Sequence, residues 1–299
     1  MYRSILLPLD GSLTSEQALP YAAALARRSG ATLQLAYVHM PLLLAEGAMY
    51  LGTPDVQLWE EERKYLVGIV DRLKKAGVEK ASGHILEGPI AKTLQDQALA
   101  DHCDLVVMTT HGRGPLSRFW LGSVADQLVH RLTLPLLLIR TTEEAPLPSG
   151  EPTIRDVLVA LDGSPASEQI LEPAGELAKI LGASCTLMRV LPAVAPPNVE
   201  DLPEAAVALA DKLRIEAHVY LKRLATSLHD RGIASRTRIV ANVSPVEAIL
   251  HESASGEYGM LALETHGRSG LPRLFLGSVA DKVVRGATIP VLVHRCLSR

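Results

Sequence analysis

The sequence has few cysteines, few aromatic residues and little excess of either charge. Its three cysteines, Cys103, Cys185 and Cys296, are an odd number without a CxxC spacing. This argues against a disulfide scaffold and a zinc knuckle, and it fits a reducing cytosol. The net charge of −3 and the 4% of aromatic residues provide neither a cluster of positive charge nor a stacking platform for bases. We therefore expect no nucleic acid partner.

Long hydrophobic runs are absent as well. The longest uncharged stretch, roughly Ser29 to Ala45, is shorter than the about 20 residues that span a bilayer, and Gln34, His39 and Pro41 interrupt it. The start, MYRSILLPLD, carries one basic residue and a short apolar run that Pro8 and Asp10 break, so it does not predict a signal peptide. We expect a cytoplasmic protein with no membrane partner.

Several catalytic patterns are also missing. The sequence contains no HExxH, no GxxxxGK[ST] phosphate-binding loop, no GxSxG and no defensible pair of spaced carboxylates. Its ten histidines are scattered, so no metal ligand can be assigned from spacing. These absences predict that the protein is not an enzyme, although slow ATP hydrolysis stays open.

What the chain does contain is a repeat of itself. ILLPLDGSLTSEQ around Asp10 returns as VLVALDGSPASEQ, and THGRGPLSRFWLGSVADQLV around His111 returns as THGRSGLPRLFLGSVADKVV, each roughly 150 residues later. Between the repeats, TTEEAPLPSGEPT contains three prolines that exclude a helix or a central strand. We predict two similar domains, residues 1–140 and 154–299, joined by a linker over residues 141–153.

Each repeat alternates short β-rich apolar runs with longer segments of helical period, which predicts an α/β fold with an open, doubly wound parallel sheet. In the first repeat the expected helices are Thr14–Arg28, Asp55–Lys75, Ile90–Ala100 and Val124–Leu132. The second repeat has counterparts of these helices. The expected strands are Ser4–Leu9, Thr32–Val38, Ser82–Leu86, Leu105–Met108, Leu136–Ile139, Asp156–Leu161, Cys185–Val190, Ser235–Val240, Tyr258–Leu263 and Val291–His294.

The segment from Gly112 to Ser123 runs from a strand end through a loop into a helix. Glycines let the backbone approach an anion, and the first N–H groups of a helix are donors at the positive end of its dipole. Arg113 and Arg118 add positive charge. The second repeat has the same spacing, with Gly267, Arg268, Arg273, Gly277 and Ser278. Both segments are candidate phosphate sites.

Structural roles explain some of these residues equally well. Ser123 with Asp126, and Ser278 with Asp281, form an S-x-x-D pattern that caps a helix start with or without a ligand.

Two more motif positions allow both interpretations. Asp10 and Asp162 follow the first strand of each repeat, where an aspartate closes an Asx turn, caps the next helix, or contacts a ribose, a base or a metal. His111 and His266 are more typical of hydrogen-bonding loop residues than of catalysts, because no nucleophile or acid accompanies them.

Both repeats resemble the universal stress protein domain, and the whole chain apart from the linker is similar to tandem proteins of that family. The resemblance rests on the strand ending in PLDGS or ALDGS, the THGR loop, and the segment from LGSVAD to PLLLIR or PVLVHR. It implies two five-stranded, Rossmann-like parallel sheets of strand order 3-2-1-4-5 and a cytoplasmic location. It also implies pairing of the two domains through their last strands within one chain, and further homodimerisation stays open.

The ATP-binding branch of the family carries Gly-x2-Gly-x9-Gly-Ser/Thr, of which both repeats match the last three elements. The resemblance implies that ATP or another adenine nucleotide, with Mg²⁺, binds there, and that Val38 or Val190 meets the adenine through its backbone. The cofactor-binding residues that it implies are Asp10, Val38, Thr109, Gly112, Arg113, Gly122, Ser123, Val124, Asp162, Val190, Gly267, Arg268, Gly277, Ser278 and Val279.

The first glycine of the family pattern is replaced in both repeats, by Thr109 and by Glu264. Thr109 adds a β-branched side chain without charge. A carboxylate about 5 Å from a phosphate charge repels it by roughly 3 kcal/mol at an effective dielectric constant of about 20. We therefore expect the first domain to be the better site, unless a divalent cation bridges Glu264 and the phosphate.

The sequence thus favours a cytoplasmic stress-response regulator that binds an adenine nucleotide at least in its first domain. A nucleotide-independent interaction or scaffold protein is the alternative, and a slow ATP hydrolase is the third hypothesis.

Overall fold

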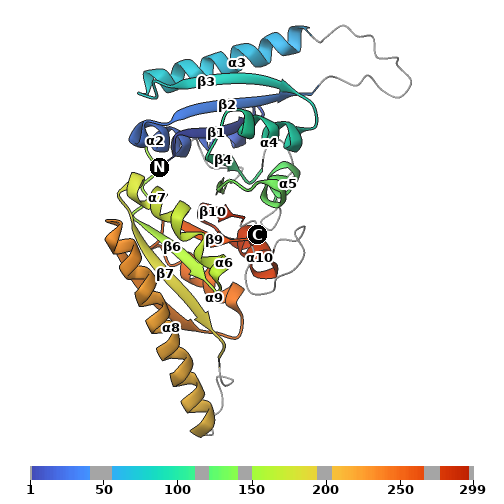
Figure 1. Cartoon of the computed structure of the whole chain (residues 1–299). Helices are drawn as coiled ribbons and strands as arrows, with labels where there is room; N and C mark the ends of the chain where they lie inside the picture. Colours follow the sequence, from blue (N-terminus) through green and yellow to red (C-terminus); the bar gives the residue numbers. More distant parts are fainter. Residues whose placement is uncertain are drawn as a thin grey trace, which may run out of the picture. The chain divides into compact units, whose positions relative to one another are not determined.

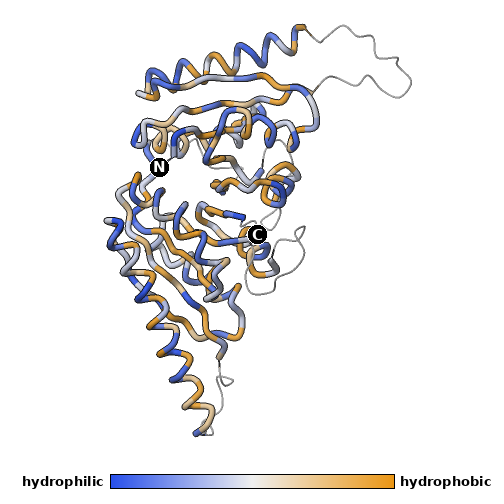
Figure 2. The backbone as a smooth tube through the Cα atoms, in the orientation of Figure 1, coloured by the Kyte–Doolittle hydropathy of each residue, from blue (hydrophilic) through white to orange (hydrophobic). Residues whose placement is uncertain are grey.

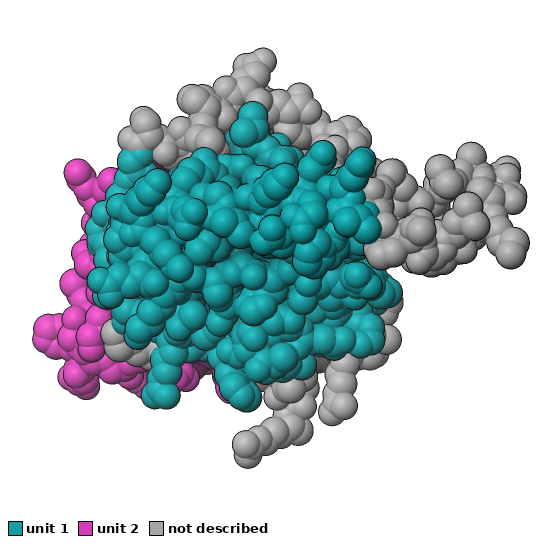
Figure 3. Space-filling model, turned by 90° about the horizontal axis from the view of Figure 1, so that it is seen from above, with its two compact units in different colours: residues 1–116, 121–152 teal, residues 117–120, 153–299 magenta. Residues whose placement is uncertain are grey.

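In a computed structural model of the chain, the structure describes residues 2–40, 56–111, 121–140, 150–193, 204–265 and 277–295. They form two compact units, unit 1 mainly from residues 1–152 and unit 2 mainly from residues 153–299 (Figure 3). Among the described residues, no helix combines the length and the hydropathy that crossing a lipid bilayer requires.

Unit 1 is a parallel sheet covered by helices on both faces, with the strand order β3-β2-β1-β4-β5 (Figure 1). Helices α2 and α3 pack on one face, and α4, which contacts α5, packs against β2 and β3. The elements are β1 Ser4–Leu9, α1 Leu13–Glu16, α2 Leu19–Ser29, β2 Thr32–His39, α3 Val56–Lys75, β3 Ala81–Glu87, α4 Ile90–Ala100, β4 Leu105–Thr109, α5 Ser123–Arg131 and β5 Leu136–Ile139.

Unit 2 repeats this arrangement with the strand order β8-β7-β6-β9-β10, also parallel. The α/β class and the strand order expected for both repeats are therefore confirmed. The elements are β6 Asp156–Leu161, α6 Pro165–Glu168, α7 Leu171–Leu181, β7 Ser184–Leu191, α8 Glu204–Asp230, β8 Ser235–Ala241, α9 Pro245–Ser253, β9 Met260–Glu264, α10 Ser278–Gly286 and β10 Val291–His294.

The helix expected over Thr14–Arg28 is instead two helices, α1 and α2. Pro20 lies in the first turn of α2. A proline has no N–H to donate to the carbonyl of residue i−4, so one continuous helix would lose a bond there and its ring would clash. The prediction of a single helix was wrong for this reason.

The predicted strand starting at Tyr258 begins at Met260 instead. The Tyr258 hydroxyl donates to Glu252 at 2.9 Å, which draws this residue toward α9. The N–H of Gly259 then bonds the carbonyl of Asp156 at 3.0 Å and leads the chain into the sheet.

Each core lies between the sheet and one stripe of each covering helix. In α3 the buried residues are Glu62, Leu66, Ile69 and Leu73, and in α8 they are Ala217, Leu221, Leu224 and Leu228. Along α8 the tube alternates between blue and orange, as expected for a helix with one buried face (Figure 2). The identical spacing of the two stripes makes Glu62 and Ala217 equivalent positions.

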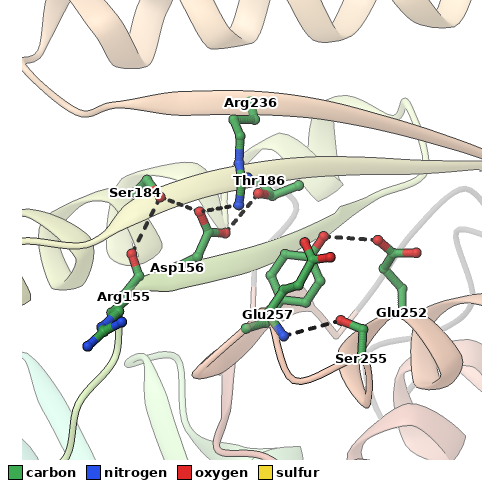
Figure 4. Close-up of polar contacts among 9 residues, drawn as sticks. Arg155, Asp156, Ser184, Thr186, Arg236, Glu252, Ser255 and Glu257 are labelled. Atoms are coloured by element: carbon green, nitrogen blue, oxygen red, sulfur yellow. Dashed lines mark hydrogen bonds and ion pairs between the residues drawn. The ribbon is translucent and has the colours of Figure 1, made fainter.

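The amino end of β6 is fixed by a buried carboxylate. Asp156 accepts hydrogen bonds from the Thr186 hydroxyl at 2.8 Å, from Arg236 at 3.1 Å and from the Ser184 hydroxyl (Figure 4). These donors lie on the neighbouring strands β7 and β8, so the cluster joins three strands at the sheet edge opposite to the strand carboxyl ends. In unit 1, Ser4 occupies the corresponding strand start, and its hydroxyl lies 3.4 Å from the sulfur of Cys103.

Candidate functional site

The DGS motif closes a tight turn at the carboxyl end of the first strand of each unit. Asp10 Oδ1 accepts hydrogen bonds from the N–H of Ser12 at 3.0 Å and from its hydroxyl at 2.6 Å. Asp162 makes the same pair of bonds to Ser164, at 2.8 and 2.6 Å. The Asx turn is therefore confirmed in both units, and the serines, not the aspartates, cap the short helices α1 and α6.

The turn and the fourth strand of each unit meet at one edge of the sheet. All strands are parallel, so their carboxyl ends lie on the same side. Helix α1, which follows the Asp10 turn, packs beside β4, and α6 packs beside β9 in the same way. The two repeated motifs thus lie at a common edge in each unit, as the sequence predicted.

Helices α5 and α10 begin at Ser123 and Ser278, and their N-caps are Gly122 and Gly277. The prediction that the serines cap these helices was wrong. Each serine has helical backbone geometry and lies one residue too late to act as the cap, and a glycine cap has no side chain to accept a bond. Both serines are exposed, and Val124 and Val279, which follow them, are half-buried.

Gly122 and Gly277 have a packing role that is independent of any ligand. The N–H of Gly122 donates to the carbonyl of Thr110 at 2.8 Å, and Gly277 does the same to Thr265. A Cβ atom at either glycine would lie 2.9 Å from that carbonyl oxygen, closer than real Cβ atoms come. Only glycine allows the helix to start so close to the strand end.

His111, directly after β4, is a buried histidine, and the described residues offer one of its ring nitrogens no hydrogen bond. Its exposed fraction is 7%, and Nδ1 lies 3.2 Å from the hydroxyl of Thr110. Nε2 is buried and has no hydrogen-bond partner within the part of the chain that the structure describes. Burial, and the charge of Arg140, lower the pKa of the imidazole from its ordinary value. His111 is thus a neutral side chain next to the start of α5, with a polar atom that the described residues leave without a partner.

The ends of β2 and β7, where Val38 and Val190 lie, differ between the units. In unit 1, Nδ1 of His39 lies 2.7 Å from Oε2 of Glu62 on α3, with both side chains buried. The two strands have the same length and register, so Leu191 occupies the position of His39 and Ala217 that of Glu62.

A second difference lies two residues before the ends of these strands. Tyr37 meets the ring of Tyr65 edge-on, with the ring centroids 6.1 Å apart. In unit 2 the guanidinium of Arg189 instead lies 5.1 Å from the ring centroid of Tyr220.

The ends of β4 and β9 carry the two replacements of the family glycine. Thr109 is buried and its hydroxyl donates to the carbonyl of His111 at 2.6 Å. The Glu264 carboxylate is also buried, and its Oε2 lies 2.9 Å from Nδ1 of His294 on the neighbouring strand β10. In unit 1 the partner of Thr109 across the strands is Ile139.

Part of the predicted site lies outside the described residues. These positions are Gly112, Arg113, Arg118, His266, Gly267, Arg268 and Arg273. Within the described ranges, His, Cys, Asp and Glu side chains do not gather in a group of three or more that could hold a metal ion.

A groove of about 370 Å³ lies between α2 and α3 of unit 1, lined by Leu19, Ala23, Ile69 and Leu73 with Arg27 and Arg72 among the polar residues. None of the predicted site residues lines it, so it is separate from the candidate site.

Sequence reasoning missed His39, Glu62, Arg189 and His294. A comparison of the two repeats contains a signal for His294, because the non-ionisable Thr109 and Ile139 of the first repeat are both replaced by ionisable residues in the second. Only the register between β9 and β10 shows that the two replacements face one another.

The sequence matches the Usp family, described as the universal stress protein family, over residues 1–140 and 153–295. It is 27% identical over 301 residues to the universal stress protein Rv2005c of Mycobacterium tuberculosis, covering 97% of this chain and 96% of that protein.

Among solved structures, a universal stress protein from Archaeoglobus fulgidus covers 98% of this chain and 96% of its own, with a TM-score of 0.67 and 21% identity. A universal stress protein solved in complex with cAMP covers 47% of this chain and 98% of its own, with a TM-score of 0.38 and 23% identity. The fold is shared with the first of these over nearly its whole length. With both repeats matched, the chain belongs to the universal stress protein family as a tandem two-domain member.

Proposed function

We propose that unit 1 binds ATP or another adenine nucleotide, with the phosphates at the N-terminus of α5. The observation that carries this proposal is the glycine cap. Helix α5 starts behind Gly122 at the carboxyl edge of the sheet, and this glycine cap offers no side-chain acceptor to the first N–H groups of the helix. Such groups, at the positive end of the helix dipole, form a ready anion site.

Two further features support a ligand at this edge. Nε2 of His111, which has no hydrogen-bond partner among the described residues, is a buried polar atom next to the start of α5, and such atoms are rare unless a ligand or water completes them. The exposed hydroxyl of Ser123 adds a donor at the first helical position. A bound Mg²⁺ would accompany the nucleotide and neutralise part of its phosphate charge. In proteins this ion is typically coordinated by one or two carboxylates together with phosphate oxygens.

In this proposal the protein acts in the cytoplasm as a stress-response regulator whose state follows the bound nucleotide, and not as a metabolic enzyme. Slow ATP hydrolysis remains a measurable third hypothesis. It requires turnover above that of a chain whose phosphate site has been blocked.

One observation favours the nucleotide-independent scaffold as a second candidate. Gly122 and Gly277 are required by the close approach to Thr110 and Thr265, so these glycines would be present without any ligand. The two candidates differ in whether purified protein carries a nucleotide. Denaturing fresh protein and identifying released nucleotides by chromatography and mass spectrometry separates them.

The phosphate position is tested with matched serine variants. Ser123→Asp places a negative charge at the start of α5, where an acidic residue favours the helix but repels phosphate. We expect calorimetry to show ATP binding to unit 1 weakened by roughly a hundredfold. Ser278→Asp is the matched change in unit 2, and Ser123→Ala removes only the hydroxyl. If Ser123→Asp binds like the wild type at both sites, the nucleotide does not bind at α5.

A further inference from the structure

Helix α8 of unit 2 continues past the sheet on which it packs (Figure 1). Its 27 residues span about 40 Å, whereas the 7 residues of the neighbouring strand β8 span about 23 Å. The buried residues of α8 begin at Ala217, so the described stretch of residues 204–216 contains no buried residue. The core of unit 2 therefore does not hold the amino-terminal part of this helix.

The composition of this part of α8 does not suit exposure to water. Its sequence, EAAVALADKLRIE, is mostly apolar. Val207, Leu209 and Ile215 are 45%, 51% and 65% exposed, and Val219, one turn after Ile215, is 64% exposed. A helix in a protein gains most of its stability by packing an apolar face. Exposed apolar side chains grouped in this way are typical of an interaction surface.

The equivalent helix of unit 1, α3, carries charged residues at the same positions. The buried stripes of α3 and α8 have the same spacing, so Ile215 corresponds to Glu60 and Val219 corresponds to Lys64. Opposite charges four residues apart are typical of a helix surface in water. The fold therefore does not require apolar residues here, and they point to a property that only α8 has.

The exposed face of α8 follows a heptad spacing, in which contact residues are separated alternately by three and four positions. These residues, which we call the α8 seam, are Ala205, Ala208, Lys212, Ile215 and Val219. Ile215 and Val219 each lie about 160° around the helix axis from the buried Ala217. The α8 seam thus faces away from the sheet, and a second helix can pack on it without displacing the core.

Charged residues at the α8 seam determine how a second α8 would align with it. In an antiparallel pair centred at residues 213–214, Lys212 of one copy lies beside Glu216 of the other, and Lys222 lies beside Glu204. Each contact occurs twice, because such a pair is twofold symmetric. A parallel pair would instead place each lysine beside the same lysine of the other copy. The charges therefore favour the antiparallel arrangement.

These four charged side chains make no ion pair with any residue that the structure describes. Other charged residues on and after α8 do have partners within unit 2. Arg223 pairs with Glu168 at 2.8 Å, and Arg231 pairs with Glu176 at 3.4 Å. A second copy would supply the four side chains with partners that the described residues do not.

We propose that two copies of the chain associate through the α8 seam, as an antiparallel pair of helices related by a twofold axis. The paired stretch, residues 204–222, is about 28 Å long. One helix face of this length is at the small end of the range for specific interfaces, so the dimer dissociates on dilution. The association does not need a nucleotide, and the inference is therefore independent of the proposed function.

The test is the molecular mass of the full-length protein, measured without nucleotide by analytical ultracentrifugation from about 1 to about 200 µM. We expect the mass to rise with concentration from the 32.2 kDa of one chain toward twice that value. The variant Ile215→Glu with Val219→Lys gives α8 the residues of α3. Because both positions are exposed, it should fold normally, while its dissociation constant rises by at least about tenfold. Val67→Lys, at an exposed position of α3, should leave the association unchanged.

A charge exchange tests the antiparallel alignment. Lys212→Glu places two carboxylates side by side at both symmetry-related contacts, so the dissociation constant should rise by roughly tenfold. Adding Glu216→Lys puts opposite charges back across the α8 seam and should restore the association. Circular dichroism confirms that each variant is folded.

The mass of a single chain at every concentration overturns the proposal and leaves this face to a partner of another kind. A dimer that is unchanged in Ile215→Glu with Val219→Lys also overturns it, because the two copies then meet at another surface. If Glu216→Lys does not rescue Lys212→Glu, the two residues do not face one another, and the antiparallel alignment is wrong.

Discussion

Nδ1 of His39 lies 2.7 Å from Oε2 of Glu62, and this buried pair in unit 1 is replaced by Leu191 and Ala217 in unit 2. The same fold therefore packs either a polar pair or an apolar pair of side chains at these two positions. Removing one partner of a buried pair leaves the other without its bond, whereas replacing both with apolar residues is often neutral.

We therefore predict that Glu62→Ala lowers the free energy of unfolding by about 3 kcal/mol. The double variant His39→Leu with Glu62→Ala, which carries the residues of unit 2, should recover most of this loss. Urea denaturation followed by circular dichroism measures both. If the double variant is no more stable than Glu62→Ala, the lost stability does not come from leaving His39 without its hydrogen-bond partner.

Gly122 and Gly277 should not tolerate a Cβ atom. The added methyl group would lie 2.9 Å from a backbone carbonyl oxygen, so Gly122→Ala and Gly277→Ala should each destabilise the protein by about 1–3 kcal/mol. Gly68, inside α3, has nothing within 4 Å of that position. The matched control Gly68→Ala should raise stability by about 0.5–1 kcal/mol. Thermal unfolding of the three variants checks this contrast. Equal shifts of the unfolding temperature in all three would contradict it.

His111 should make stability depend on pH. Its pKa in the folded state is lowered from 6.5 by burial and by the charge of Arg140. Below pH 6.5 the unfolded chain therefore binds more protons than the folded chain, and the free energy of unfolding falls as the pH decreases. His111→Asn should lose less stability than the wild type between pH 7.5 and pH 5. Parallel slopes for the two proteins would exclude this role.

Cys103 and Cys185 should be unreactive in the folded protein. Both are buried, and burial raises the pKa of each thiol, that of Cys185 to about 12 with a contribution from Asp156. A thiol reacts through its thiolate, so a disulfide reagent at pH 8 should label neither until urea unfolds the chain. A Cys296→Ser background restricts the assay to these two thiols. Rapid labelling in native buffer would contradict the prediction that both thiols are unreactive in the folded protein.

The linker predicted over residues 141–153 should be the first site of proteolysis. Its three prolines exclude regular pairing, and exposed segments between domains are preferred cleavage sites. Glu151 is bonded to Arg28 at 3.0 Å and lies 3.4 Å from Arg27, so a glutamate-specific protease should cut at Glu143 or Glu144 before Glu151. Mass spectrometry of the first fragments identifies the bond that is cut first. Early cuts within residues 90–139 would move the boundary.

The sequence by itself determined the repeat and the positions of the ten strands to within two residues, and it offered the Asx turns at Asp10 and Asp162 as one of the alternatives there. These features depend on hydrophobic period and on bonds between residues two or three apart, which are local. The resemblance to the family supplied the strand order, which the sheet of each unit confirms.

Only the tertiary structure decided which residues meet across the sheet. Glu264 and His294, or His39 and Glu62, are far apart in the chain and become neighbours through strand register and helix packing. The position of the N-cap of α5 also depends on tertiary packing. The approach of Gly122 to the carbonyl of Thr110 sets where the helix begins, and it makes Ser123 the first helical residue. Such contacts depend on how separate elements pack, which local periodicity does not encode.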